Sequence, residues 1–260
     1  MGGVSKTIGI ALMVAATRPG MSTAQQPATG FLDRSVTVDG RTYAYQVYVP
    51  RSYDGGEAWP VILFLHGAGE RGADGLIQTE VGLGSAVRRA PESYPAIIVF
   101  PQVPLEETWQ GDAGRAALAA LDQTLAEFDT DPSRVYLTGM SMGGNGTWYL
   151  AYHHPERFAA LAVVCGFVSG LASFGSFLPE AERSRFERLA ERIRDLPVWI
   201  VHGEADPAVP VSESRAMHAA LDAAGAAVHY VELTGVGHNA WDPAYRSSEL
   251  PAWLFAQRRP

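Results

Sequence analysis

A serine in a glycine-flanked turn is the strongest chemical signal in the sequence. Residues 134–144 read R-V-Y-L-T-G-M-S-M-G-G, an apolar run that enters G-x-S-x-G and continues into a helical pattern. Gly139 and Gly143 permit a sharp turn from strand to helix that holds Ser141 outward, and the start of that helix favours developing negative charge. This context indicates a nucleophilic serine rather than an ordinary glycine-rich turn.

A nucleophilic serine needs a histidine base that a carboxylate orients. Asp206 lies in a polar loop after the apolar run 198–201, and His238 lies in a glycine-flanked loop after residues 228–233. Glu204 is the competing acid, but its longer side chain starts nearer the end of the strand. We therefore expect Ser141, Asp206 and His238 to be the catalytic residues.

Acyl transfer also needs backbone donors for an oxyanion. One is normally the amide after the nucleophile, here Met142, and the H-G-x-G start of the loop 66–72 suits the other. The same loop fits the dinucleotide motif G-x-G-x-x-G, but residues 73–84 are too interrupted for a phosphate-binding helix and no strand with an acidic end follows. Metal-binding spacings such as H-E-x-x-H do not occur, so we expect neither a cofactor nor a metal.

Three tryptophans lie near strand ends where a substrate would sit. Trp241 lies three residues beyond His238, and Trp109 follows the segment 101–104. Their rings could hold an aryl group of the substrate, with packing as the alternative. We expect packing for Trp148.

The elements that must position these residues form an alternating pattern. Nearly continuous apolar runs, typical of strands covered on both faces, occur at 61–65, 96–100, 135–138, 161–164, 198–201 and 228–233. Helical patterns lie between and after them, at 113–128, 142–153, 181–194, 212–224 and 241–257. Residues 35–38 and 42–49 flank Asp39-Gly40, which predicts an antiparallel hairpin at the leading edge. We expect an α/β fold with a mostly parallel central sheet and helices on both faces.

Composition excludes several classes of function. The chain has 260 residues with 20 basic and 28 acidic side chains, a net charge of −8 that disfavours nucleic acid and anionic membranes as partners. Its only lysine, Lys6, precedes the expected domain, so a Schiff base or a P-loop lysine is not available there. Cys165 is the only cysteine, which excludes an intramolecular disulfide.

The N-terminal segment reads as a targeting signal. Residues 1–24 combine Lys6, an apolar run at 8–17 and small residues before a cleavage point, as in a secretory signal peptide. The run is too short to span a membrane, and a plain N-terminal extension is the alternative. We expect a linker at 25–30, a single catalytic domain at 31–260, and a secreted or periplasmic protein without a membrane span.

The motifs together resemble the serine esterases of the α/β hydrolase superfamily, in particular the group related to feruloyl esterases, polyhydroxybutyrate depolymerases and so-called predicted peptidases. The matching stretches are 64–72, 101–104 with Trp109, 139–144, 197–206 and 237–245. The order Ser, Asp, His is the one this superfamily uses. The resemblance implies ester hydrolysis by the three residues, with the amides of Ala68 and Met142 as oxyanion donors. The short stretch 166–179 leaves little room for a lid and implies an open cleft.

We therefore expect a serine carboxylesterase that acts through an acyl-enzyme on small-molecule or polymeric esters, such as feruloyl, other aryl or acetyl esters of plant polysaccharide. A polyester depolymerase of the polyhydroxybutyrate or PET type, a serine peptidase of the prolyl oligopeptidase type and a non-catalytic binding protein are the alternatives. The complete set of Ser141, Asp206 and His238 argues against the last. A monomer is the expected state.

Overall fold

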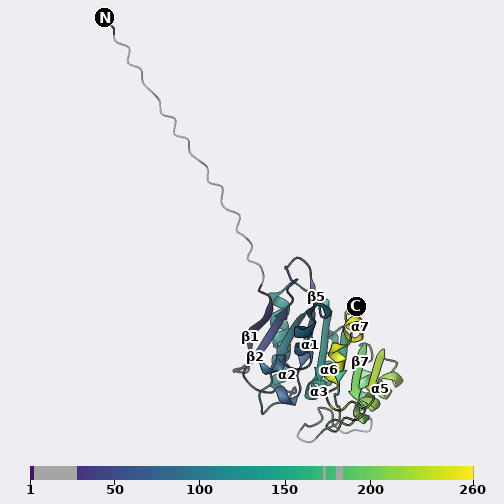
Figure 1. The fold of residues 1–260 in the computed structure, drawn as a ribbon. Coiled ribbons are helices and arrows are strands. Elements are labelled where there is room, and N and C mark those ends of the chain that lie inside the picture. The colour runs from purple at the N-terminus through teal and green to yellow at the C-terminus, as the bar shows by residue number, and fades with distance from the viewer. Residues whose placement is uncertain (3–27, 172–173, 180–183, 260) are drawn as a thin grey trace.

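The protein folds around one mixed, eight-stranded sheet with the strand order β1-β2-β4-β3-β5-β6-β7-β8. The computed structural model describes residues 1–2, 28–171, 174–179 and 184–259 (Figure 1). The strands are β1 (Gly30–Val38), β2 (Arg41–Val49), β3 (Trp59–Leu65), β4 (Ile97–Pro101), β5 (Thr130–Met140), β6 (Ala160–Val164), β7 (Val198–Gly203) and β8 (Val228–Leu233). β1 pairs with β2 and β2 with β4 in the antiparallel sense, whereas all pairs from β4 to β8 are parallel. The predicted sheet is confirmed.

Helices cover both faces of this sheet. They are α1 (Leu83–Arg89), α2 (Asp112–Glu127), α3 (Met142–His153), α4 (Arg185–Ile193), α5 (Ser212–Ala223), α6 (Trp241–Arg246) and α7 (Glu249–Ala256). The apolar sides of α2 to α5 share one buried cluster with one face of the strands, and those of α1, α6 and α7 share a second cluster with the other face. β3, β4 and β6 are therefore apolar almost throughout, because each is covered on both sides.

One expected helix is divided in the structure, and one helix was not expected. The pattern 241–257 was expected to be one helix, but the chain breaks between α6 and α7, where Ser247 is extended and its Oγ donates to the carbonyl oxygen of Ala244 and accepts from the amide of Leu250. α1 was not among the expected helices. It forms because Ala86 and Val87 bury their side chains against the sheet.

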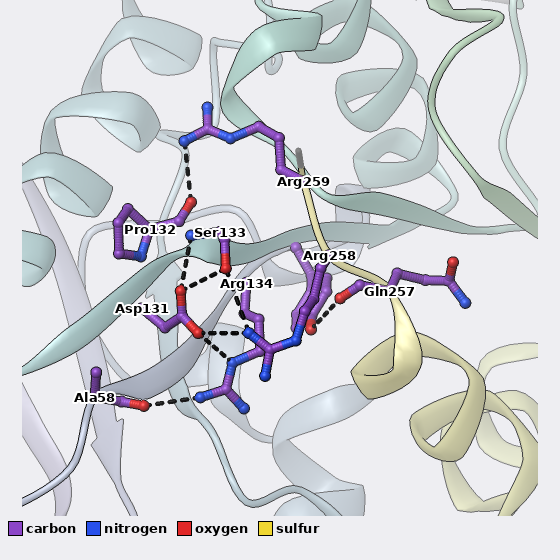
Figure 2. Close-up of polar contacts among 9 residues, drawn as sticks. Ala58, Asp131, Pro132, Ser133, Arg134, Gln257, Arg258 and Arg259 are labelled. Carbon is purple, nitrogen blue, oxygen red and sulfur yellow. Dashed lines mark hydrogen bonds and ion pairs between the residues drawn. The ribbon is translucent and has the colours of Figure 1, made fainter.

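Residues 257–259 form hydrogen bonds with the start of β5, which is the end of that strand remote from Ser141 (Figure 2). The amide of Arg259 donates to the carbonyl oxygen of Ser133 at 2.8 Å. Asp131 accepts from Arg134 at 2.7 Å and Arg258 at 3.0 Å. The hydrogen bonds from Ser133 and the guanidinium of Arg134 hold the pKa of Asp131 well below its usual range, against the effect of burial.

The expected signal peptide lies almost wholly outside the described residues, which resume at residue 28. Among the helices of the described part, none has the length and apolar character needed to cross a membrane. Between β6 and α4, the described residues 165–171 and 174–179 contain no helix, and Leu171 forms an isolated bridge with Phe174.

Candidate active site

Ser141 lies in a strained turn between β5 and α3. Its φ of 54° and ψ of −118° are rare for a residue with a side chain, so the surrounding contacts must hold this conformation. Its amide donates to the carbonyl oxygen of Val164 on β6 at 2.9 Å. A Cβ at Gly143 would lie 1.9 Å from the carbonyl oxygen of Leu65, and one at Gly139 would lie 2.2 Å from that of Gly143. The turn therefore requires glycine at both positions.

The three residues expected to be catalytic form a continuous chain of hydrogen bonds. Nε2 of His238 lies 3.0 Å from Oγ of Ser141, and Nδ1 of His238 lies 2.7 Å from Oδ2 of Asp206. A carboxylate can only accept, so Nδ1 carries the hydrogen and Nε2 is free to accept the hydroxyl proton of the serine. The side chain of Asp206 is fully buried, whereas that of His238 is 25% exposed.

The loop after β7 secures the carboxylate of Asp206. Its Oδ1 accepts hydrogen bonds from the amides of Ala208 at 2.8 Å and Val209 at 2.9 Å. Burial alone would raise the pKa of Asp206, but the hydrogen bonds from His238 and these two amides outweigh it and hold the pKa below its usual value. The competing acid, Glu204, is exposed and instead accepts from the amide of Gly235.

The expected oxyanion donors lie on both sides of the nucleophile. Met142 is the first residue of α3, and the first helical bond there runs from the amide of Asn145 to the carbonyl oxygen of Ser141, so the amide of Met142 has no acceptor within the helix. Ala68 begins a short 3₁₀ turn after Gly67. A Cβ at Gly67 would lie 3.6 Å from Cβ of Ser141, which places this turn beside the nucleophile.

A buried histidine organises the loop after β3. Nδ1 of His66 lies 2.6 Å from the carbonyl oxygen of Gly67, and its Nε2 lies 3.0 Å from the amide nitrogen of Val103. Nε2 must therefore accept and Nδ1 must donate, which defines a neutral tautomer. Burial lowers the pKa of His66 to about 4, and the ring stays neutral at pH 7. This role of His66 was not expected from the sequence.

The charged residues of the same loop bind its backbone. Nε of Arg71 donates to the carbonyl oxygen of Ala68 at 3.0 Å, and its Nη1 donates to that of Leu105 at 2.8 Å. Nε2 of Gln102 donates to the carbonyl oxygen of Glu70 at 3.2 Å. Burial raises the pKa of Glu70, although backbone amides of the turn donate to its carboxylate. The loop that carries Ala68 is thus fixed by side chains from two connections of the sheet.

The connection after β6 borders the other side of the site. Because β3 and β6 flank β5 in the sheet, the loops that follow them lie on either side of Ser141. Nδ2 of Asn145 donates to the carbonyl oxygen of Phe167 at 2.9 Å. The guanidinium of Arg71 lies 5.7 Å from the ring centre of Phe174, which joins the two loops.

The three tryptophans differ in how far they are exposed. Trp109 is 1% exposed, so it presents no face to a substrate, and the expectation that it lines the site was wrong. Trp148 packs in the core as expected, at 2% exposure. Trp241 is half-buried, with its ring perpendicular to the imidazole of His238 at a centroid distance of 5.3 Å. It alone of the three is partly exposed and lies beside His238.

One group of side chains in the described residues has the spacing of metal ligands. Ligand atoms of Cys165, Asp206 and His238 all lie within 4.8 Å of one another. Asp206 and His238 are hydrogen-bonded to each other, and burial raises the pKa of the Cys165 thiol far above its usual value. The deprotonated thiolate that a metal needs is therefore disfavoured.

A nucleophile elbow on a mostly parallel sheet, followed along the chain by an acid after β7 and a histidine after β8, defines the α/β-hydrolase fold. The sequence profile of the prolyl oligopeptidase family matches residues 105–256. The chain belongs to this family.

Similar proteins with known names are mostly esterases. A solved structure described as a thermostable esterase superposes with a TM-score of 0.74 at 31% identity, covering 88% of this chain and 63% of that one. The putative esterase NocK of Nocardia uniformis is 29% identical over 190 residues, which is 68% of this chain and 49% of the relative. An uncharacterized secreted protein of Arthroderma benhamiae is 29% identical over 69% of this chain and 21% of the relative. Feruloyl esterase B of Neurospora crassa is 27% identical over 48% of this chain and 46% of the relative. This chain thus spans half or less of these curated relatives.

Proposed function

We propose that the protein is a serine carboxylesterase that hydrolyses esters through an acyl-enzyme, with Ser141, His238 and Asp206 as its catalytic residues. The observation that carries this proposal is the uninterrupted hydrogen-bonded chain from Oγ of Ser141 through the imidazole of His238 to Oδ2 of Asp206. The positive φ of Ser141, maintained by glycines that no other residue could replace, supports a functional rather than a structural serine.

The proposed reaction follows from the positions of the donors and acceptors. Nε2 of His238 takes the proton from Ser141 as Oγ attacks the ester carbonyl, and Asp206 stabilises the imidazolium that results. The amides of Ala68 and Met142 donate to the oxyanion. His238 then protonates the departing alcohol, and a water molecule activated by the same imidazole releases the acid.

The acyl and alcohol groups are the finer part of the proposal. Trp241 places an aromatic ring next to His238, which favours esters with an aryl group such as a feruloyl ester. Several relatives are named as esterases, among them feruloyl esterase B, and this supports ester hydrolysis. Short acetyl esters also fit, because they need no subsite beyond the triad and the oxyanion donors.

Peptide hydrolysis is the second candidate, because the family profile that matches residues 105–256 is that of the prolyl oligopeptidases. A comparison of kcat/KM on p-nitrophenyl acetate, p-nitrophenyl butyrate, methyl ferulate, a polyester film and a peptide amide separates the two. We expect turnover of the small esters at least a hundredfold above that of the peptide amide. A reversed ratio would favour the peptidase.

The Ser141→Ala variant is the control for every substrate. We expect it to fold as the wild type and to lose activity by roughly 10⁴- to 10⁶-fold, the scale that follows removal of a triad serine. Retention of more than a tenth of the wild-type activity, with an unchanged circular dichroism spectrum, would remove Ser141 from the mechanism.

We also propose that residues 1–24 direct export and are cleaved, leaving a linker and one catalytic domain from residue 31. Support comes from the apolar run at 8–17 and from a relative named as a secreted protein. The intact mass of protein exported by its native host should correspond to a chain beginning at Gln25 or within a few residues of it. A cytosolic product that retains residue 1 or 2, with no exported form, would contradict export.

A further inference from the structure

A second histidine contacts the carboxylate of Asp206. His202 is near the end of β7, and its side chain is fully buried. Its Nδ1 lies 2.6 Å from Oγ of Ser214 on α5, and its Nε2 lies 3.0 Å from the carbonyl oxygen of Val209. The same Nε2 lies 3.2 Å from Oδ2 of Asp206.

These partners determine where the hydrogen of His202 resides. Both neighbours of Nε2, a carbonyl oxygen and a carboxylate oxygen, can only accept, so Nε2 must carry a hydrogen. Nδ1 then accepts the hydroxyl hydrogen of Ser214. Burial lowers the pKa of His202, against the raising effect of Val209 and Asp206, which agrees with a neutral ring at pH 7.

Asp206 consequently has donors beside both oxygens: it accepts three hydrogen bonds, and its Oδ2 also lies 3.2 Å from the single Nε2–H of His202, which that group shares with the carbonyl oxygen of Val209. Oδ1 has the amides of Ala208 and Val209, and Oδ2 has Nδ1 of His238 and Nε2 of His202. The two amides hold Oδ1 in place but do not contact Oδ2. The contact with His202 restrains the oxygen that faces His238.

We propose that His202 is a positioning residue for the reaction, whose Nε2–H is shared between the carbonyl oxygen of Val209 and Oδ2 of Asp206 and so orients that carboxylate and reduces its pull on the proton of His238. The inference rests on the proposed function, because it assigns His202 a role through the triad. It extends the hydrogen-bonded chain inward, from Ser141 through His238, Asp206 and His202 to Ser214 on α5.

Two other titratable groups lie close to this chain in the described residues. Cys165, after β6, has its thiol within 4.8 Å of ligand atoms of Asp206 and His238, and burial keeps it protonated. Glu232 on β8 interacts electrostatically with His202 and is held ionised by its pair with Arg215. Neither group changes charge between pH 5 and 8, so a shift of the pH–activity profile in that range arises from titration of the histidines.

The test compares His202→Leu with His202→Gln. Leucine fills the space without a donor, whereas the terminal amide of glutamine reaches the position of Nε2 and restores one. We expect His202→Leu to lower kcat on p-nitrophenyl acetate by about 10- to 100-fold, the size of one hydrogen bond to a charged group, with KM within about twofold of the wild type. Because the carboxylate would then attract the proton of His238 more strongly, the acid limb of the kcat/KM profile should move to higher pH. His202→Gln should restore most of kcat and the wild-type limb.

Titration with a fluorophosphonate counts functional serines, so kcat is expressed per correctly folded site. Ser214→Ala, which leaves the buried donor in place but removes the partner of Nδ1, should show a smaller loss of the same kind. His154→Leu, at a partly exposed position after α3, is the matched control and should behave as the wild type.

An unchanged kcat per titrated site and an unmoved acid limb in His202→Leu would overturn the inference. A loss in His202→Gln equal to that in His202→Leu, at equal melting temperatures, would also overturn it. If Ser141→Ala retains activity, the proposed triad fails instead, and the two failures are thereby distinguished.

Discussion

Trp109 donates a hydrogen bond from its indole Nε1 to the main-chain carbonyl oxygen of His66, 2.9 Å away, and its ring meets the edge of the imidazole at a centroid distance of 4.8 Å. The tryptophan thus lies beneath the loop that begins at His66 and carries Ala68. A Cβ at Gly146 on α3 would lie 2.5 Å from Cβ of Trp109, so the indole fills the space between this loop and the helix that follows Ser141. It connects the two sides of the proposed oxyanion hole.

Substitution of Trp109 should therefore affect all substrates alike. Trp109→Phe retains an aromatic ring but leaves the carbonyl oxygen of His66 without its donor and opens a small cavity. We expect the free energy of unfolding to fall by about 1–3 kcal/mol. We also expect kcat/KM to fall by the same factor for p-nitrophenyl acetate and for methyl ferulate. Urea denaturation and rates on both esters measure these effects. A loss confined to methyl ferulate would show that the ring contacts substrate after all.

Trp241 should behave in the opposite way. Its half-buried ring stands beside His238, so Trp241→Ala removes a surface against which an aryl group can pack. We expect kcat/KM for methyl ferulate to fall by about 5- to 150-fold, which corresponds to about 1–3 kcal/mol of apolar burial. The rate on p-nitrophenyl acetate, measured in parallel, should fall several-fold less. Equal losses on both esters, or a large drop in melting temperature, would assign Trp241 to packing.

The strands of the sheet and the grouping of Ser141, Asp206 and His238 were predictable from the sequence, because both depend on local patterns. A nucleophile elbow needs glycine at fixed positions, and buried parallel strands need apolar runs, so Ser141 and β3 to β8 are visible without a structure. The triad geometry then follows from the rule that loops after parallel strands meet at one edge of the sheet.

The direction of a side chain and its distant partners could not be predicted in the same way. Trp109 follows β4 at the functional edge, and nothing in its neighbourhood indicates that its ring points into the core toward His66. His202 lies only four residues before Asp206 along the chain, but the approach of its ring to the carboxylate depends on the turn of the loop between them. α1 was missed because tertiary burial, rather than local propensity, stabilises a helix of seven residues preceded by glycines.

Gly143 allows a sharp test of the elbow. Gly143→Ala would place a methyl group 1.9 Å from the carbonyl oxygen of Leu65 and 2.6 Å from that of His66, and both are backbone atoms that cannot move aside cheaply. We expect a protein that is insoluble or has lost several kcal/mol of stability, with no measurable esterase activity. Gly69→Ala, in a position where no atom lies within 4 Å of the added Cβ, is the matched control and should remain folded and active. A stable, active Gly143→Ala protein would show that the start of α3 does not lie this close to the end of β3.

The buried, neutral His66 should make stability depend on pH between about 6.5 and 4. Its pKa is about 4 in the folded protein, whereas an exposed histidine in the unfolded chain titrates near 6.5. The unfolded state therefore binds more protons in this interval, so the stabilisation is complete above pH 6.5 and is lost as the pH falls toward 4. The difference corresponds to about 3 kcal/mol, and His202, whose pKa burial also lowers, adds to it with the same sign.

In His66→Gln, whose amide can replace both hydrogen bonds but does not titrate, the free energy of unfolding should fall less steeply over this range, as measured by urea denaturation at half-unit pH steps. His154→Gln, at a partly exposed position, should keep the wild-type slope. Parallel curves for His66→Gln and the wild type would show that His66 takes up no proton on unfolding.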